Sequence, residues 1–227
     1  MFFLPFLAFF FFLYLIILGV LFAVLQIGAL TFVFTRIGVP PATVFTLLLL
    51  SLFGSFINIP IKRMHSELIE PGRIVSFYGW KFEVPGARRH KESVLAINLG
   101  GAVVPAALSF YLTAVNLDIL LSIALATAIV SFIVFRLAKP LKGVGIVIPT
   151  FVPPVAAALT ALLISKPYAP IIAYIASSLG TLIGADLLNL NKIAGLGAPV
   201  ASIGGAGTFD GVFLTGIIAV LLTSFQI

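Results

Sequence analysis

Long apolar runs with almost no charge recur along this sequence, and they limit the environments in which the chain can fold. The first run extends from residue 1 to about residue 34 without a charged side chain. A helix needs roughly 20 apolar residues to cross a bilayer. The whole 227-residue chain is 61% hydrophobic and 9% charged, which is more apolar surface than a soluble domain of this size can bury. We therefore expect an all-α polytopic membrane protein.

Apolar length, and the Pro and Gly residues between runs, predict about seven transmembrane helices in a single transmembrane domain covering residues 1–227. The first run has no preceding Lys or Arg and no small-residue cleavage site, so we expect it to remain in the mature protein rather than to act as a signal peptide. The predicted spans are residues 1–34, 41–61, 94–115, 118–135, 149–164, 168–188 and 208–225.

Positive charge is distributed unequally between alternate loops. Eleven Lys and Arg residues follow spans two, four and six, whereas only Arg36 and Lys166 fall in the other loops. The positive-inside rule places the eleven in the cytoplasm. The protein is then expected in the cell membrane with its N-terminus cytoplasmic and its C-terminus external. The net charge of +6 therefore indicates a membrane surface and lipid as partner, and not a nucleic acid.

The one sizeable polar segment is the cytoplasmic loop at residues 62–92. Within it, Tyr78, Trp80, Phe82 and Val84 alternate with more polar residues, a period of two that predicts a short β-hairpin or a strand at the membrane surface. Two functions fit such a strand. It can anchor the loop through its aromatic residues, which we favour, or offer an edge to an extended peptide.

Two acidic residues are predicted to lie at membrane depth. Of the seven Asp and Glu residues, four are in the cytoplasmic loop and Asp118 precedes span four. Asp186 lies near the end of span six and Asp210 near the start of span seven. Because these helices are antiparallel, both carboxyl groups are expected at a similar depth near the cytoplasmic side. A carboxylate within a span costs about 2.5–3.5 kcal/mol on insertion scales, so a function is expected for it.

Each aspartate also has a purely structural explanation. Asp210 would fall in the first turn of a helix, where free backbone N–H groups and the helix dipole favour a carboxylate. Asp186 would fall in the last turns, where the dipole disfavours it, so it would need to pair with Lys192 or Asn189. Gly180 and Gly184 form a smooth ridge for close helix packing, and Asp186 is expected opposite that ridge.

The connection between the two aspartates is rich in glycine and poor in charge, so we expect irregular backbone that dips into the membrane interface. Gly207 and Gly211 flank Asp210 and would let a ligand approach it. With their neighbours they form the candidate substrate-binding positions, which are Gly207, Thr208, Phe209, Gly211 and Asn189.

Two adjacent carboxyl groups can share one proton, so that one activates a water molecule while the other protonates a carbonyl oxygen. This chemistry needs no cofactor, and none is expected. The chain has no cysteine, and His65 and His90 both fall in the cytoplasmic loop, which argues against a metal site in the membrane. The sequence therefore predicts a catalytic dyad of Asp186 and Asp210 acting on a transmembrane peptide.

The placement of the two aspartates resembles that in the intramembrane aspartyl proteases of the presenilin and signal-peptide-peptidase group. In that group the catalytic aspartates lie on the sixth and seventh helices, and the second belongs to a GxGD motif. Here the corresponding residues are Gly207-Thr208-Phe209-Asp210, so the first glycine matches and Phe209 replaces the second. The group's Pro-Ala-Leu motif on a ninth helix has no counterpart span in this chain. The resemblance covers about the last sixty residues and implies peptide-bond hydrolysis.

A second resemblance covers most of the chain. The segments Asn58-Ile59-Pro60, Gly184-Ala185-Asp186 and Gly204 to Gly216 are similar to a family of prokaryotic membrane proteins known only as a domain of unknown function. That resemblance implies no activity.

Two further functions remain open. An ion-coupled transporter would use the same aspartates together with broken helices, for which Asn98 and Pro105 in span three are candidates. Seven spans show no inverted repeat, although a homo-oligomer could supply one. In a scaffold the aspartates would only hydrogen-bond between helices.

Overall fold

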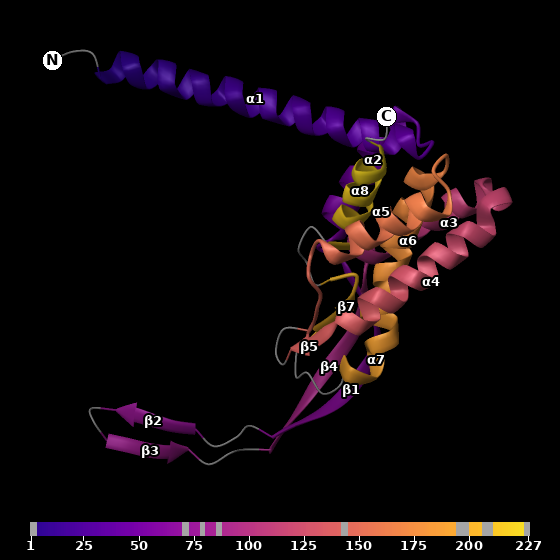
Figure 1. Cartoon of the computed structure of the whole chain (residues 1–227). Helices are drawn as coiled ribbons and strands as arrows, with labels where there is room; N and C mark the ends of the chain where they lie inside the picture. Colours follow the sequence, from indigo (N-terminus) through magenta and orange to yellow (C-terminus); the bar gives the residue numbers. More distant parts are fainter. Residues whose placement is uncertain are drawn as a thin grey trace.

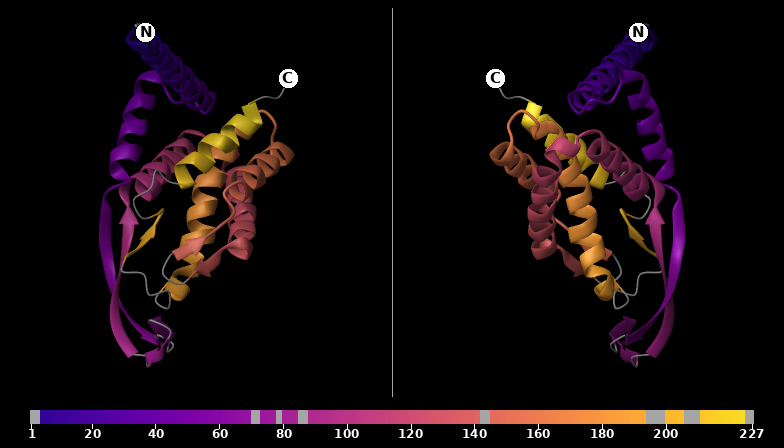
Figure 2. Two further views of the ribbon diagram at one scale, coloured as in Figure 1. Left: turned by 90° about the vertical axis from the view of Figure 1, so that its left-hand side faces the viewer. Right: turned by 90° about the vertical axis from the view of Figure 1, so that its right-hand side faces the viewer.

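The structure is a computed structural model, and helices make up most of it (Figures 1 and 2). It describes the backbone of residues 4–69, 73–77, 80–84, 88–141, 145–193, 200–205 and 211–224. Within these ranges, side chains are described except at residues 4–10, 23, 25, 26, 41, 64–69, 73–77, 80–84, 88–92, 141, 145, 193 and 211.

Proline marks the first turn of four helices, where its fixed φ suits the helix and its missing N–H costs nothing. These are α2, α3, α5 and α6. The α-helices are α1 Leu4–Arg36, α2 Pro41–Gly54, α3 Val104–Val115, α4 Leu120–Leu137, α5 Val152–Ile164, α6 Ala169–Thr181, α7 Leu190–Ile193 and α8 Gly211–Ser224; π-helical turns are η1 Leu99–Val103 and η3 Leu182–Asp186, and 3₁₀ turns are η2 Leu117–Ile119 and η4 Leu187–Asn189.

Three helical stretches in the described part of the chain are long and apolar enough to cross a membrane. They are Phe11–Arg36, Leu117–Leu137 and Ala169–Lys192, the last formed by α6 and the turns that follow it. The remaining apolar helices have 10–17 residues: Ala42–Gly54, Leu99–Val115, Val152–Ile164 and Val212–Ser224. The structure thus agrees with a helical membrane protein, while the count of seven complete spans stays a prediction.

The predicted bounds of spans two and three are wrong, because parts of both are strands. Strand β1 runs over Asn58–Ile69 and pairs antiparallel with β4, Arg88–Asn98. Strand β7, Val200–Ile203, then pairs parallel with β4, giving the order β1-β4-β7. Residues 58–61 and 94–98 are therefore extended where helix was predicted. Apolar content alone does not distinguish a buried strand from a helix. Here these residues are strands because they pair with segments far away in the sequence.

Of the hairpin or strand predicted within residues 62–92, the structure has a hairpin. Strand β2, Arg73–Phe77, pairs antiparallel with β3, Trp80–Val84, and the hairpin lies beyond the far end of β1 and β4, away from the helices (Figure 1). Two further short strands, β5 Lys139–Leu141 and β6 Gly145–Val147, pair between α4 and α5. The loop is thus mostly a two-stranded extension, which we call the β1–β4 ribbon.

The core lies between α4, α5, α6 and α8, with α6 at its centre. Ten residues of α6 are buried, and Tyr174 is fully enclosed. Near the end of α1, Phe34 packs with its ring 6.5 Å from that of Tyr174 and 6.0 Å from that of Phe213 on α8. Most of α1 before that point is exposed and projects from the bundle in Figure 1, as expected of a helix whose solvent is lipid.

Candidate functional site

Asp186 is the last residue of the π-helical turn that continues α6. Its carboxylate oxygen Oδ2 accepts a hydrogen bond of 2.8 Å from the backbone N–H of Gly204, just after β7. The side chain is half-buried, and among the described residues it has no ion-pair partner. π-Helical turns occur mostly as single bulges within α-helices, frequently at functional sites. The structure thus holds the Asp186 carboxylate against a backbone segment 18 residues away.

Glycine is required at position 204 for two reasons. Its φ is +79°, a left-handed conformation that costs other residues energy. A Cβ atom there would also lie 2.7 Å from the backbone nitrogen and the Cβ of Ala102. Gly204 therefore fits between η1 and the Asp186 turn, which brings its N–H to the carboxylate.

The predicted glycine ridge of Gly180 and Gly184 packs closely against a neighbouring helix. A Cβ at Gly180 would lie 2.8 Å from Val130, and one at Gly184 would collide with the carbonyl oxygen of Ser131. Both neighbours belong to α4. The two glycines thus allow α6 and the turn after it to pack closely against α4. Asp186 bonds to a different segment, the one that follows β7.

The structural partners proposed for Asp186 bond to each other instead. Lys192 donates from Nζ to Oδ1 of Asn189 at 2.7 Å, and its ammonium lies 5.2 Å from the centre of the Phe135 ring. Asn189 is buried and donates from Nδ2 to the carbonyl oxygens of Gly184 and Ala185, both at 3.0 Å. Asn189, a candidate substrate-binding residue, thus caps carbonyl groups of the π-helical turn.

The other predicted site residues, Asp210, Gly207, Thr208 and Phe209, lie outside the described residues, and Gly211 begins α8. The contacts of Val212, two positions after Asp210, are described. Val212 is buried in one apolar cluster with Leu182 of the π-helical turn and Ile203 of β7. The start of α8 therefore belongs to the same small apolar cluster as the turn that carries Asp186 and the strand that precedes Gly204.

Sequence reasoning missed a polar network that holds β7 and η1 in place. Asn98, 1% exposed, donates from Nδ2 to the carbonyl oxygen of Ser55 at 2.6 Å and to Oδ1 of Asn58 at 3.1 Å. Its own Oδ1 accepts from the N–H of Gly101 at 2.7 Å. Ser202 on β7 donates to Oδ1 of Asn58 at 2.6 Å. The available signal was the Asn58-Ile59-Pro60 segment, which carried a family resemblance without a role.

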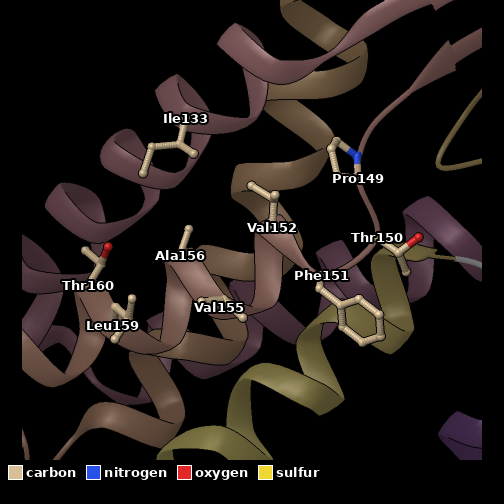
Figure 3. Close-up of a pocket in the computed structure, with 9 residues that line it drawn as sticks. All are labelled: Ile133, Pro149, Thr150, Phe151, Val152, Val155, Ala156, Leu159 and Thr160. Atoms are coloured by element: carbon tan, nitrogen blue, oxygen red, sulfur yellow. The ribbon is translucent and has the colours of Figure 1, made fainter.

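Two cavities are lined by described residues, and Asp186 lines neither of them. One of about 640 Å³ lies between α4 and the start of α5, and its lining is apolar apart from Thr150 and Thr160 (Figure 3). Another, of about 380 Å³, is lined by residues of α3, α4 and α6 and by Ile183 of the π-helical turn. Neither is lined by an acid, a base or a nucleophile other than hydroxyl groups. Where side chains are described, no three His, Asp or Glu residues are grouped as for a metal ion.

Comparisons with known proteins show a family without an established activity. No curated protein and no solved structure matches the chain, so they supply no link to the presenilin and signal-peptide-peptidase group. The family described as "Protein of unknown function (DUF1614)" matches residues 52–222, a range that includes Asn58, Asp186, Gly204 and Asp210. Because this match covers well over half of the chain, the protein belongs to the DUF1614 family.

Proposed function

We propose that the protein is an intramembrane aspartyl protease in which Asp186 and Asp210 form the catalytic dyad. The observation that carries the proposal is the burial of Val212 with Leu182 and Ile203. Leu182 lies one turn before Asp186, and Val212 lies two residues after Asp210. The shared cluster supports the proposal that the two segments carrying the aspartates lie in one region of the fold, as a shared proton requires.

The hydrogen bond to Gly204 distinguishes the two oxygens of Asp186. Oδ2 accepts the backbone N–H, which favours the charged form of the carboxyl group, so the ionised role is assigned to Asp186. The ionised carboxylate would take a proton from water, and the resulting hydroxide would attack the peptide carbonyl carbon. Protonated Asp210 would donate its proton to the carbonyl oxygen. Collapse of the tetrahedral intermediate would then break the C–N bond, with a proton passing to the leaving amine.

The edge of β7 supports a peptide as substrate. β7 is at the end of the three-stranded order and leads directly into Gly204. An edge strand offers unpaired backbone groups to an extended segment. A peptide added there would pair with β7, whose C-terminal end leads to the Gly204 N–H that Asp186 binds. Its backbone would be extended, which is the conformation in which a scissile bond is accessible. The β2–β3 hairpin then has no necessary part in binding substrate.

We further propose the predicted topology of seven spans, with the N-terminus and the β1–β4 ribbon cytoplasmic and the C-terminus external. It rests on the asymmetry of Lys and Arg between alternate loops. In this arrangement Asp186 lies near the cytoplasmic end of the Ala169–Lys192 helix.

The test is cleavage of a membrane-helix reporter by the purified chain in proteoliposomes. Asp186→Asn and Asp210→Asn should each reduce cleavage to background, because Asn cannot exchange the proton. Asp118→Asn is the matched control, since Asp118 is exposed in the turn before α4 and should leave the rate unchanged. Thermal unfolding of all three variants checks that they fold. Cleavage that survives either dyad substitution would remove the proposal.

One observation favours a second candidate, an ion or proton pathway. Two π-helical turns, η1 and η3, lie next to the buried Asn98 and to Asp186, and interrupted helices with buried polar groups line transporter sites. In the same liposomes, a pH gradient that dissipates only with native Asp186 and Asp210, without cleavage of the reporter, would support transport.

A further inference from the structure

The β1–β4 ribbon brings together both histidines of the chain. His65 lies on β1 and His90 on β4, and the sequence has no others. The antiparallel register pairs His65 with Glu92, and Glu67 with His90. Successive residues of a strand alternate between its two faces, so these two pairs share a face, and the pair between them, Ser66 with Lys91, is on the opposite face.

The backbone spacing of these four residues suits a single ion. Cβ atoms of directly opposite residues are about 4.5–5.5 Å apart, and residues two apart along a strand are separated by roughly 6.7 Å. The four Cβ positions therefore outline a rectangle with its centre roughly 4 Å from each corner.

The donor types select the kind of ion. Two imidazoles and two carboxylates give two nitrogen and two oxygen ligands, a set that Zn²⁺ accepts in tetrahedral geometry. Ca²⁺ and Mg²⁺ require more oxygen ligands and no nitrogen. We propose that His65, Glu67, His90 and Glu92 bind one zinc-class divalent ion on the β1–β4 ribbon.

The ribbon has a physical use for such an ion. β7 pairs with β4 only from Val94 to Ile97, so in the described part of the chain the segment that carries the four residues is two-stranded. Two-stranded ribbons are marginally stable in water. An ion held by both strands would fix their register outside the bundle, between the helices and the β2–β3 hairpin.

The neighbouring charges on the same face suggest an alternative to metal binding, in which the residues only form cross-strand pairs. The adjacent pairs on that face are Arg63 with Val94 and Ile69 with Arg88, which places one arginine at each end of the group. Without an ion, the same pattern would serve only as cross-strand pairs between Glu and His or Arg. The two outcomes differ in whether a metal binds.

The test is Zn²⁺ binding to the full chain in nanodiscs, with any polyhistidine tag removed, by competition with a chromogenic chelator. We expect one ion per chain. Loss of even an outer partner of a zinc ligand costs about 10–100-fold in affinity, so the His65→Ala/His90→Ala double variant should lose at least about 100-fold. The matched control is Ser66→Ala/Lys91→Ala, which changes the intervening pair on the opposite face and should bind as the native chain does.

Two further measurements distinguish a site from a folding defect. Affinity should fall as the pH is lowered below about 6.5, because protons compete for the imidazole nitrogens. Zn²⁺ should also slow amide hydrogen exchange in β1 and β4 of the native chain. Glu92→Gln, which preserves side-chain size, should weaken binding. The proposal is wrong if the native chain binds no Zn²⁺, if the double histidine variant binds equally well, or if the control loses affinity to the same extent.

Discussion

At the residue scale, Gly204 shows how one backbone position shapes the candidate site. Its left-handed conformation and its contact with Ala102 allow its N–H to reach Asp186. Neither property could be assigned from the sequence, because the Gly204-Gly205 pair alone does not reveal which glycine has a close neighbour. The ridge of Gly180 and Gly184 could be assigned, since spacing along one helix is local information.

Replacement of Gly204 by Ala should separate crowding from backbone conformation. Gly38 is the matched control, because its φ is +82° but nothing lies within 4 Å of an added Cβ. Gly38→Ala should cost about 1–2 kcal/mol in the free energy of unfolding, from the left-handed conformation alone. Gly204→Ala should cost about 1–3 kcal/mol more, because the neighbouring backbone must shift. Unfolding in mixed micelles measures both, and equal losses would contradict the close packing against Ala102.

At the element scale, Asn98 joins three pieces of secondary structure. It bonds to the residue that follows α2, to β1, and to the first turn of η1. These contacts explain why the chain leaves α2 as a strand and why β4 passes directly into a helix. The sequence indicated a break near Asn98, but it did not reveal that the break is a strand pairing across 40 residues.

Asn98→Ala should destabilise the protein strongly. The change leaves the Gly101 N–H without its acceptor and the Ser55 carbonyl oxygen without the Asn98 donor in a buried position, and each buried unsatisfied group costs about 1–3 kcal/mol. We expect a loss of at least about 2 kcal/mol in the free energy of unfolding. Asn116→Ala is the control, because Asn116 makes a single bond to the Leu112 carbonyl in a partly exposed turn. A similar loss in both variants would argue against the network.

At the scale of the whole molecule, the proposed topology can be mapped with single cysteines, because the native chain has none. Leu117, in the turn between α3 and α4, is 64% exposed and should be external. Ser66, on the β1–β4 ribbon, should be cytoplasmic. A membrane-impermeant maleimide added to intact cells should therefore label Leu117→Cys, and should label Ser66→Cys only after the membrane is opened. Labelling with the reverse pattern would invert the proposed orientation.

The sequence by itself predicted a membrane environment for the chain and the positions of most of its helices. A mean hydropathy of +1.26 and apolar runs of membrane length predict a membrane protein, and Pro and Gly between runs mark helix ends. Local spacing likewise predicted the β2–β3 hairpin and the face of α6 that packs on α4. All of these depend on residues close together in the chain.

Only the tertiary structure decided how distant segments meet near Asp186 and on the ribbon. It brought Gly204 to Asp186, Val212 to Leu182 and Ile203, and Ser202 to Asn58. It also turned two apolar segments into paired strands and placed His65 and His90 on one face. The physical reason is that strand pairing and burial are satisfied between segments far apart in sequence, and periodicity within one segment carries no record of its partner.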